Sequence, residues 1–90
     1  MAFIRIDSKE AQRLIDDESA AVVDIRDRVS FESGRIKNAD HIDNESVLTW
    51  IETANKDLPI IVCCYHGNMS QGAAEYLNQN GFEKSYSLDG

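Results

Sequence analysis

The feature that most constrains the fold is a short apolar run, Ile60 to Cys64, which begins directly after Pro59. A run of this length is too short for a membrane helix, which needs about 20 residues, but it suits a strand buried on both faces. Proline at the start of a strand removes no hydrogen bond from the ladder. A polar turn follows the run, and residues 70–80 then favour a helix that ends at Asn80-Gly81. The sequence therefore predicts a central strand, a turn and a helix in succession.

Strand and helix segments alternate along the rest of the chain. Residues 20–25 are a second run typical of a buried strand, and residues 27–33 predict a short helix capped by Asp27. The remaining candidates are strands at residues 3–6, 39–42 and 84–88, a helix from the cap Ser8 to about Asp17, and a helix whose apolar stripe is Val47, Leu48, Ile51 and Ala54. Such alternation predicts an α/β fold, a parallel sheet with helices on both faces.

The length and net charge of the chain limit the kinds of function it can have. The 90 residues predict one domain, residues 1–90, and the net charge of −7 argues against binding to nucleic acid or to an anionic membrane. The N-terminus lacks the apolar segment of a signal peptide, and Asp7 and Glu10 come early in it. We therefore expect a cytoplasmic protein with no membrane contact.

The two cysteines, Cys63 and Cys64, are adjacent. A disulfide between them closes almost no loop and is strained, so a redox-sensing pair is the least favoured interpretation. Their spacing does not suit a zinc site, and we expect no metal. Free thiols in a reducing compartment fit better. Cys63 lies within the predicted strand and is expected to face the core.

Cys64 ends the predicted strand and precedes a turn that opens into a helix. Amide groups in the turn and in the first helical turn lack partners, and the helix adds about half a positive charge at its N-terminus. Both effects lower the pKa of a thiol and favour the nucleophilic thiolate. Gly67 allows a tight turn with positive φ, and Asn68 tolerates that region. Burial as a small apolar side chain is an equally common state for cysteine, and it remains open for Cys64.

Polar residues near the two predicted strand ends have more than one interpretation. Arg26 and Arg28 follow the strand at residues 20–25, where they either attract an anion or pair with Asp24 and Asp27. The pattern favours neither. His66 is interpreted as a loop histidine rather than an acid–base group.

Four segments together resemble a known family. Residues 64–68 (Cys-Tyr-His-Gly-Asn), followed by a serine and Gly-Ala-Ala, resemble the active-site loop of single-domain rhodaneses, in particular the GlpE-type thiosulfate sulfurtransferases. Residues 22–27, 34–42 and 86–90 resemble further motifs of that family, in the same order along the chain. The similarity covers essentially the whole chain.

The resemblance implies a five-stranded, three-layer rhodanese-like fold and a two-step reaction without a cofactor. The thiolate of Cys64 takes the outer sulfur of thiosulfate as a persulfide and passes it to cyanide or to a thiol such as reduced thioredoxin. A persulfide relay between protein partners, poor with thiosulfate, is the alternative. With Cys64 as the catalytic residue, the expected substrate-binding residues are Tyr65, His66, Gly67, Asn68, Met69, Ser70, Arg26 and Arg28.

The sequence departs from the family pattern at several positions. Met69 replaces a serine of the active-site loop, and Arg35 and Asn38 replace a histidine and a glycine of the motif at residues 34–42. The chain ends at Gly90, so the C-terminal helix of the family is expected to be missing and apolar sheet surface to be exposed. A related cysteine phosphatase needs an arginine six residues after the cysteine, where this chain has Ser70. Phosphoryl chemistry is therefore not expected.

Overall fold

The computed structural model describes residues 3–64 and 69–89. In chain order the described elements are β1 (Ile4–Ile6), α1 (Ser8–Glu18), β2 (Ala21–Asp24), α2 (Arg28–Ser33), β3 (Asp40–His41), α3 (Val47–Thr53), β4 (Ile60–Cys63), α4 (Met69–Gln79) and β5 (Ser85–Leu88). The strands form one five-stranded sheet in the order β1-β5-β4-β2-β3, and all four pairings are parallel. The predicted α/β class and parallel sheet are confirmed.

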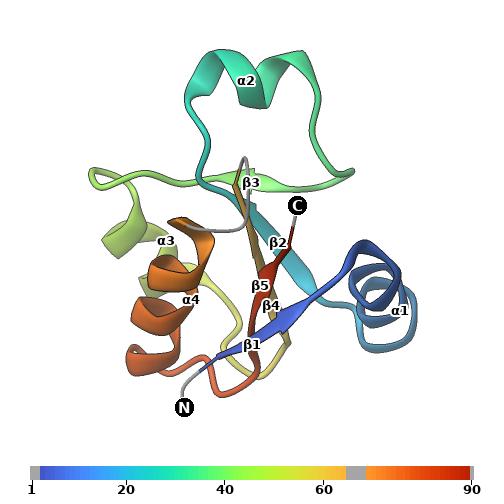
Figure 1. Ribbon diagram of the computed structural model, residues 1–90. Coiled ribbons are helices and arrows are strands. Elements are labelled where there is room, and N and C mark those ends of the chain that lie inside the picture. Colours follow the sequence, from blue (N-terminus) through green and yellow to red (C-terminus); the bar gives the residue numbers. More distant parts are fainter. Residues whose placement is uncertain (1–2, 65–68, 90) are drawn as a thin grey trace.

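Helices cover both faces of the sheet (Figure 1). On one face, Leu14 of α1 and Phe31 of α2 pack in a buried cluster with Ile61 of β4. On the other face, Ile51 of α3 and Leu77 of α4 pack in a second cluster with alternate residues of β2 and β4. Residues of β4 therefore contribute to both clusters, which explains why Ile60 to Val62 are completely buried and why the sequence there is uniformly apolar.

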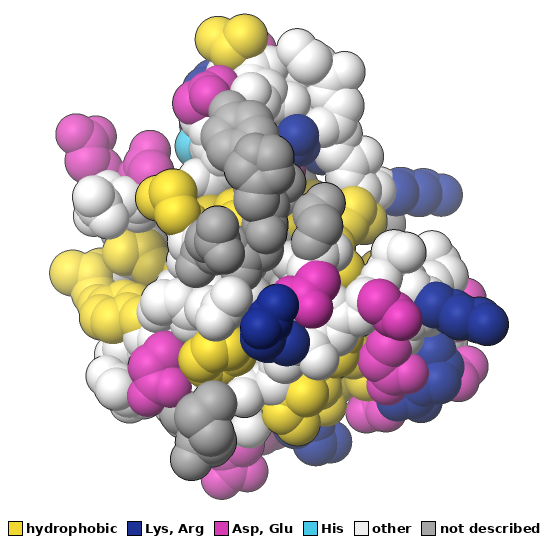
Figure 2. Space-filling view, viewed as in Figure 1, with side chains coloured by type: hydrophobic (Ala, Val, Ile, Leu, Met, Phe, Trp, Pro, Cys, Tyr) yellow, Lys and Arg dark blue, Asp and Glu magenta, His cyan; other side chains and the backbone are white. Residues whose placement is uncertain are grey.

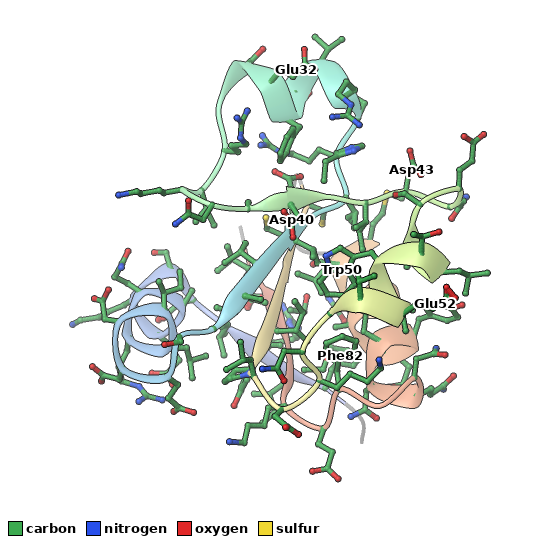
Figure 3. All side chains as sticks on the ribbon, turned by 180° about the vertical axis from the view of Figure 1, so that it is seen from behind. Glu32, Asp40, Asp43, Trp50, Glu52 and Phe82 are labelled. Atoms are coloured by element: carbon green, nitrogen blue, oxygen red, sulfur yellow. The ribbon has the colours of Figure 1, made fainter. Side chains whose placement is uncertain are left out.

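Aromatic packing joins α3 to the segment that precedes β5. The ring of Trp50 stacks on that of Phe82, with 5.4 Å between the centroids (Figure 3). The indole Nε1–H donates to a carboxylate oxygen of Asp40 at 3.1 Å. Trp50 thus anchors α3 to β3 and to the core beneath α4.

Side-chain caps fix the starts of two helices. Asp7, the residue before α1, accepts a hydrogen bond from the N–H of Glu10 at 2.9 Å. The prediction that Ser8 caps this helix is therefore wrong by one residue, because the carboxylate of Asp7 reaches the first turn. Asp27 caps α2 as predicted and accepts from the N–H of Ser30 at 2.8 Å.

The order of the strands determines where a ligand can bind. From β2 the chain moves outward to β3, whereas from β4 it moves to β5 on the opposite side. The connections that leave these two neighbouring strands diverge, and such a divergence opens a crevice at the carboxyl ends of the strands. The paired residues at those ends are Asp24 and Cys63. The described helices include none with the length and apolar character needed to cross a bilayer.

Candidate active site

Cys64 lies at the carboxyl edge of the sheet, immediately beyond the last residue of β4. The N–H of Ile25 donates to the carbonyl of Cys63 at 3.0 Å, so the ends of β2 and β4 are joined just before this thiol. The crevice between the diverging connections begins at the same point. Cys64 therefore occupies the place in the fold where a parallel sheet ordinarily binds its ligand.

The first turn of α4 contacts the sulfur atom of Cys64. The N–H of Ser70 donates to Cys64 Sγ at 3.3 Å. Amides at a helix N-terminus have no carbonyl partner within the helix, and the helix dipole places a partial positive charge there. Cys64 itself is half-buried, so it remains accessible to a small reactant. This arrangement favours negative charge on the sulfur and fits a nucleophile.

Cys63, one residue earlier, has the opposite environment. Its side chain is buried, with 7% exposed, and packs in the cluster beneath α1 and α2. Its thiol donates to the carbonyl of Val23 at 3.4 Å. Burial, with the nearby Asp24 carboxylate as the next cause, raises the pKa of Cys63 to about 12. This thiol stays protonated at neutral pH, and the prediction that Cys63 faces the core is confirmed.

Asp24 and Arg26 form an ion pair at the end of β2, in which the carboxylate is buried and the guanidinium is partly buried. The guanidinium donates from Nε to both carboxylate oxygens at 3.0 Å and from Nη2 to Oδ2 at 2.7 Å. The N–H of Arg26 also donates to Oδ1 at 2.9 Å. Asp24 is 1% exposed, so its charge requires such a partner. Of the two interpretations left open for Arg26, the structure shows the ion pair with Asp24.

Two further contacts fix the position of Arg26. Its guanidinium donates to the carbonyl of Gly34, the residue that follows α2. The Nε2–H of His41 donates to the carbonyl of Arg26 at 2.6 Å, and the His41 ring packs against Phe31 with centroids 5.1 Å apart. The end of β2, the strand β3 and the end of α2 are thereby held together around one residue, Arg26, through its guanidinium and its main-chain carbonyl.

A pocket of about 310 Å³ opens beside these groups. It is lined by Asp24, Arg26, Gly34, Arg35, Ile36, Cys63 and Cys64. Its size is at the lower end of the range for small-molecule sites. Within residues 3–64 and 69–89, no group of three or more His, Cys, Asp or Glu side chains is arranged to hold a metal ion. The pocket thus combines one accessible thiol with two guanidinium groups.

The rhodanese-like domain family matches residues 7–90. The chain belongs to this family. Among curated relatives, the thiosulfate sulfurtransferase GlpE of Vibrio cholerae is 48% identical over 98% of this chain and 83% of its own length. The protein of the same name from Pseudomonas aeruginosa is 51% identical over 98% of this chain and 79% of its own length. The resemblance stated from the sequence is confirmed.

Solved structures show the same fold. A rhodanese-related protein from Thermoplasma volcanium superimposes with a TM-score of 0.80 at 25% identity, covering 97% of this chain and 84% of its own. A rhodanese-like domain protein from Staphylococcus aureus gives a TM-score of 0.81 at 25% identity, covering 97% of this chain and 85% of its own. The five-stranded rhodanese-like fold expected from the sequence is therefore confirmed.

The remaining site residues of this rhodanese domain fall in three places. Arg28 is exposed as the first residue of α2 and does not line the pocket that contains Cys64. Ser70 points its hydroxyl inward, where Oγ lies 2.7 Å from Ser87 Oγ, and presents only its N–H to the thiol. Tyr65, His66, Gly67 and Asn68, all expected to bind substrate, lie outside the described residues.

Met69 lines a second, apolar cavity of about 660 Å³ between α3 and α4. This cavity, here called the α3–α4 groove, is also lined by Leu48 and Tyr76. Figure 2 shows hydrophobic side chains gathered over α3 and the start of α4. Leu48, expected on the apolar stripe of α3, is 61% exposed, so its side chain borders the groove rather than the core.

Sequence reasoning missed two residues that the rhodanese fold brings to the site. Arg35 appeared only as a departure from a motif, yet it lines the pocket with Cys64. Ser87 of β5 appeared only within the last motif, yet it holds the hydroxyl of Ser70. For Ser87, the available signal was the pair of serines Ser85 and Ser87 on the buried side of β5. Buried hydroxyl groups need hydrogen-bond partners, so these serines indicated a polar contact inside the fold.

Proposed function

We propose that this chain, acting as one domain over residues 1–90, is a thiosulfate sulfurtransferase whose sulfur carrier is Cys64. The observation that supports this most strongly is the hydrogen bond from the Ser70 N–H to Cys64 Sγ at the N-terminus of α4. It joins a thiol to a main-chain donor at the ligand-binding edge of the sheet. The curated relatives named thiosulfate sulfurtransferase share about half of their residues with this chain, which supports the same substrate.

In the first step, the Cys64 thiolate attacks the outer sulfur of thiosulfate and forms a new S–S bond. The bond between that sulfur and the sulfonate sulfur breaks, and sulfite leaves with the electron pair. The product is a Cys64 persulfide, whose terminal sulfur carries the negative charge. The Ser70 N–H and the positive end of the α4 dipole stabilise this anion, as they stabilise the thiolate before it.

In the second step, an acceptor attacks the terminal sulfur and restores the Cys64 thiolate. With cyanide, a C–S bond forms, the persulfide S–S bond breaks, and thiocyanate leaves. With a thiolate acceptor, such as a small thiol or reduced thioredoxin, the product is a persulfide on the acceptor. Neither step needs a cofactor, because each is a displacement at divalent sulfur.

The first residues of the loop after Cys64, together with Met69, Ser70, Arg26 and Arg28, were expected to contact the substrate. The placement of Arg26 beside the thiol supports a contribution from its charge, although Asp24 neutralises most of it. For Ser70, the geometry supports a role through the N–H alone. Neither cysteine forms a disulfide, which supports a cytoplasmic setting.

A second candidate is a persulfide relay between proteins. The α3–α4 groove favours it, because exposed Met69, Leu48 and Tyr76 give an apolar surface next to the start of α4. In a relay, Cys64 accepts its sulfur from a protein and reacts slowly with thiosulfate.

Thiocyanate formation from thiosulfate and cyanide tests the proposal. We expect steady turnover by the wild type, turnover by Cys63→Ser within about threefold of it, and at least about a 1,000-fold loss in Cys64→Ser. A wild type that accepts sulfur but turns over no thiosulfate supports the relay instead. Equal turnover by Cys64→Ser contradicts both candidates.

A further inference from the structure

Arg35 is a cation whose charge no described carboxylate neutralises. None of the ion pairs among residues 3–64 and 69–89 includes it. Its guanidinium lies over the ring of Phe31, 4.5 Å from the centroid, and Nη1 donates to the carbonyl of Phe31 at 3.3 Å. A guanidinium has five N–H donors, so donors remain for a ligand. The ring fixes the group without cancelling its charge.

The positive charge of Arg35 lies at the pocket that contains Cys64. Arg35 and Cys64 line the same pocket of about 310 Å³, together with Ile36 and the Asp24–Arg26 pair. The carboxylate of Asp24 and the guanidinium of Arg26 neutralise one another, so Arg35 leaves the pocket lining with a net positive charge. The chain as a whole carries −7 and repels anions at long range. The positive charge of Arg35 offsets that repulsion for an anionic reactant that enters the pocket beside Cys64.

We propose that Arg35 is an anion subsite for the sulfurtransferase reaction: it binds the negatively charged group of a reactant while the sulfur of that reactant meets Cys64. The ligand chemistry is an oxyanionic group of a small sulfur-containing reactant, either the sulfonate end of thiosulfate or the carboxylate of a small acceptor thiol. The inference rests on the proposed function for its biological meaning, but the subsite itself is testable without sulfur transfer.

Alkylation of Cys64 measures the subsite directly. Iodoacetate and iodoacetamide differ in charge and have similar size, and with either reagent the thiolate forms a C–S bond while iodide leaves. The ratio of their rates therefore reports attraction of a carboxylate to the thiol. We expect Arg35→Gln to lower the iodoacetate-to-iodoacetamide ratio about threefold to tenfold and Arg35→Lys to keep most of it.

Lys37→Gln is the matched control, because Lys37 is an exposed cation two residues away that does not line the pocket. It removes the same charge from the chain, and we expect the ratio to change less than about twofold. An Arg35→Gln ratio equal to that of Lys37→Gln overturns the subsite. An equal fall in both rates, with the ratio unchanged, also overturns it, because that result indicates a structural effect only.

Two further rate measurements show whether the anion that binds Arg35 belongs to thiosulfate or to the acceptor thiol. The first is the rate of sulfur gain from thiosulfate, followed by intact mass. The second is the rate of sulfur loss from persulfidated protein to 3-mercaptopropionate, compared with neutral 2-mercaptoethanol. A decrease of the first rate in Arg35→Gln assigns the subsite to the sulfonate, and selective slowing with 3-mercaptopropionate assigns it to the acceptor. Failure of the wild type to gain sulfur contradicts the proposed function, while the alkylation ratio still decides the subsite.

Discussion

The last residue of β4 and the residue that follows it place two adjacent thiols in opposite environments. The Cys63 side chain is buried in the core, and its thiol donates a hydrogen bond to the carbonyl of Val23. Its pKa of about 12 keeps this thiol protonated at neutral pH. Cys64 is half-buried beside a pocket and accepts a hydrogen bond from the start of α4. The reactivity of a cysteine in this fold therefore depends on whether the strand has ended, a difference of one residue.

The contrast between the two thiols is expected to be largest in their rates of alkylation. At pH 8 a thiol with a pKa of about 12 is ionised in roughly one molecule in 10,000, and burial slows reagent access further. We expect iodoacetamide to label Cys64→Ser, through Cys63, at least about 100-fold more slowly than it labels Cys63→Ser, through Cys64. Mass spectrometry after timed quenching measures both rates. Comparable rates would remove the distinction between the two cysteines.

Asp24→Asn is expected to cost about 3–5 kcal/mol of the free energy of unfolding, because it leaves the Arg26 guanidinium partly buried without a counter-ion. Urea denaturation measures the loss. Asp17→Asn is the matched control, since the Arg13–Asp17 pair is exposed and long at 3.9 Å, and we expect it to cost under about 0.5 kcal/mol. A cost below about 1 kcal/mol for Asp24→Asn would show that the pair contributes little.

Alkaline pH is expected to destabilise the wild type more than Cys63→Ser. The folded-state pKa of Cys63 is raised above the ordinary value of 9.0, so between about pH 9 and 12 the unfolded chain loses this proton and the folded chain keeps it. Stability is therefore complete below pH 9 and falls by at most about 1.4 kcal/mol per pH unit above it. Urea midpoints at pH 8.5 and 10.5 measure the difference. Parallel losses in the two proteins would contradict the raised pKa.

The smallest expected effect is that of Ser70→Ala. It leaves Ser87 Oγ without its partner and costs about 1–2 kcal/mol of stability, but it keeps the N–H that reaches Cys64. We expect the rate of sulfur gain from thiosulfate to stay within about threefold of the wild type. A 100-fold slower gain in a stable variant would instead assign the hydroxyl a direct role with substrate.

Local sequence patterns predicted much of the fold. The apolar runs Ala21 to Val23 of β2 and Ile60 to Cys63 of β4 indicated strands buried on both faces, and Asp27 marked the start of α2, as observed. The predicted start of a helix was less accurate where two residues that can cap a helix are adjacent, as with Asp7 and Ser8 at the start of α1. Leu48 was placed on the apolar stripe of its helix, but it is exposed beside the α3–α4 groove, which helical spacing does not reveal.

The candidate site was only partly predictable. The strand–turn–helix pattern identified Cys64 as the thiol beside a helix N-terminus, and the structure provides the N–H that reaches it. The choice between an ion pair and a substrate contact for Arg26 depended on side-chain geometry at the end of β2, which spacing does not encode. Arg35 reaches the pocket because the chain returns past the strand ends after α2, and this is a tertiary effect.

The central claim is that Cys64 carries the transferred sulfur, and intact-mass analysis after a brief reaction with thiosulfate tests it most directly. We predict that Cys63→Ser gains the mass of one sulfur atom, that cyanide removes it, and that Cys64→Ser gains nothing. A stable sulfur gain in Cys64→Ser with none in Cys63→Ser would contradict the claim.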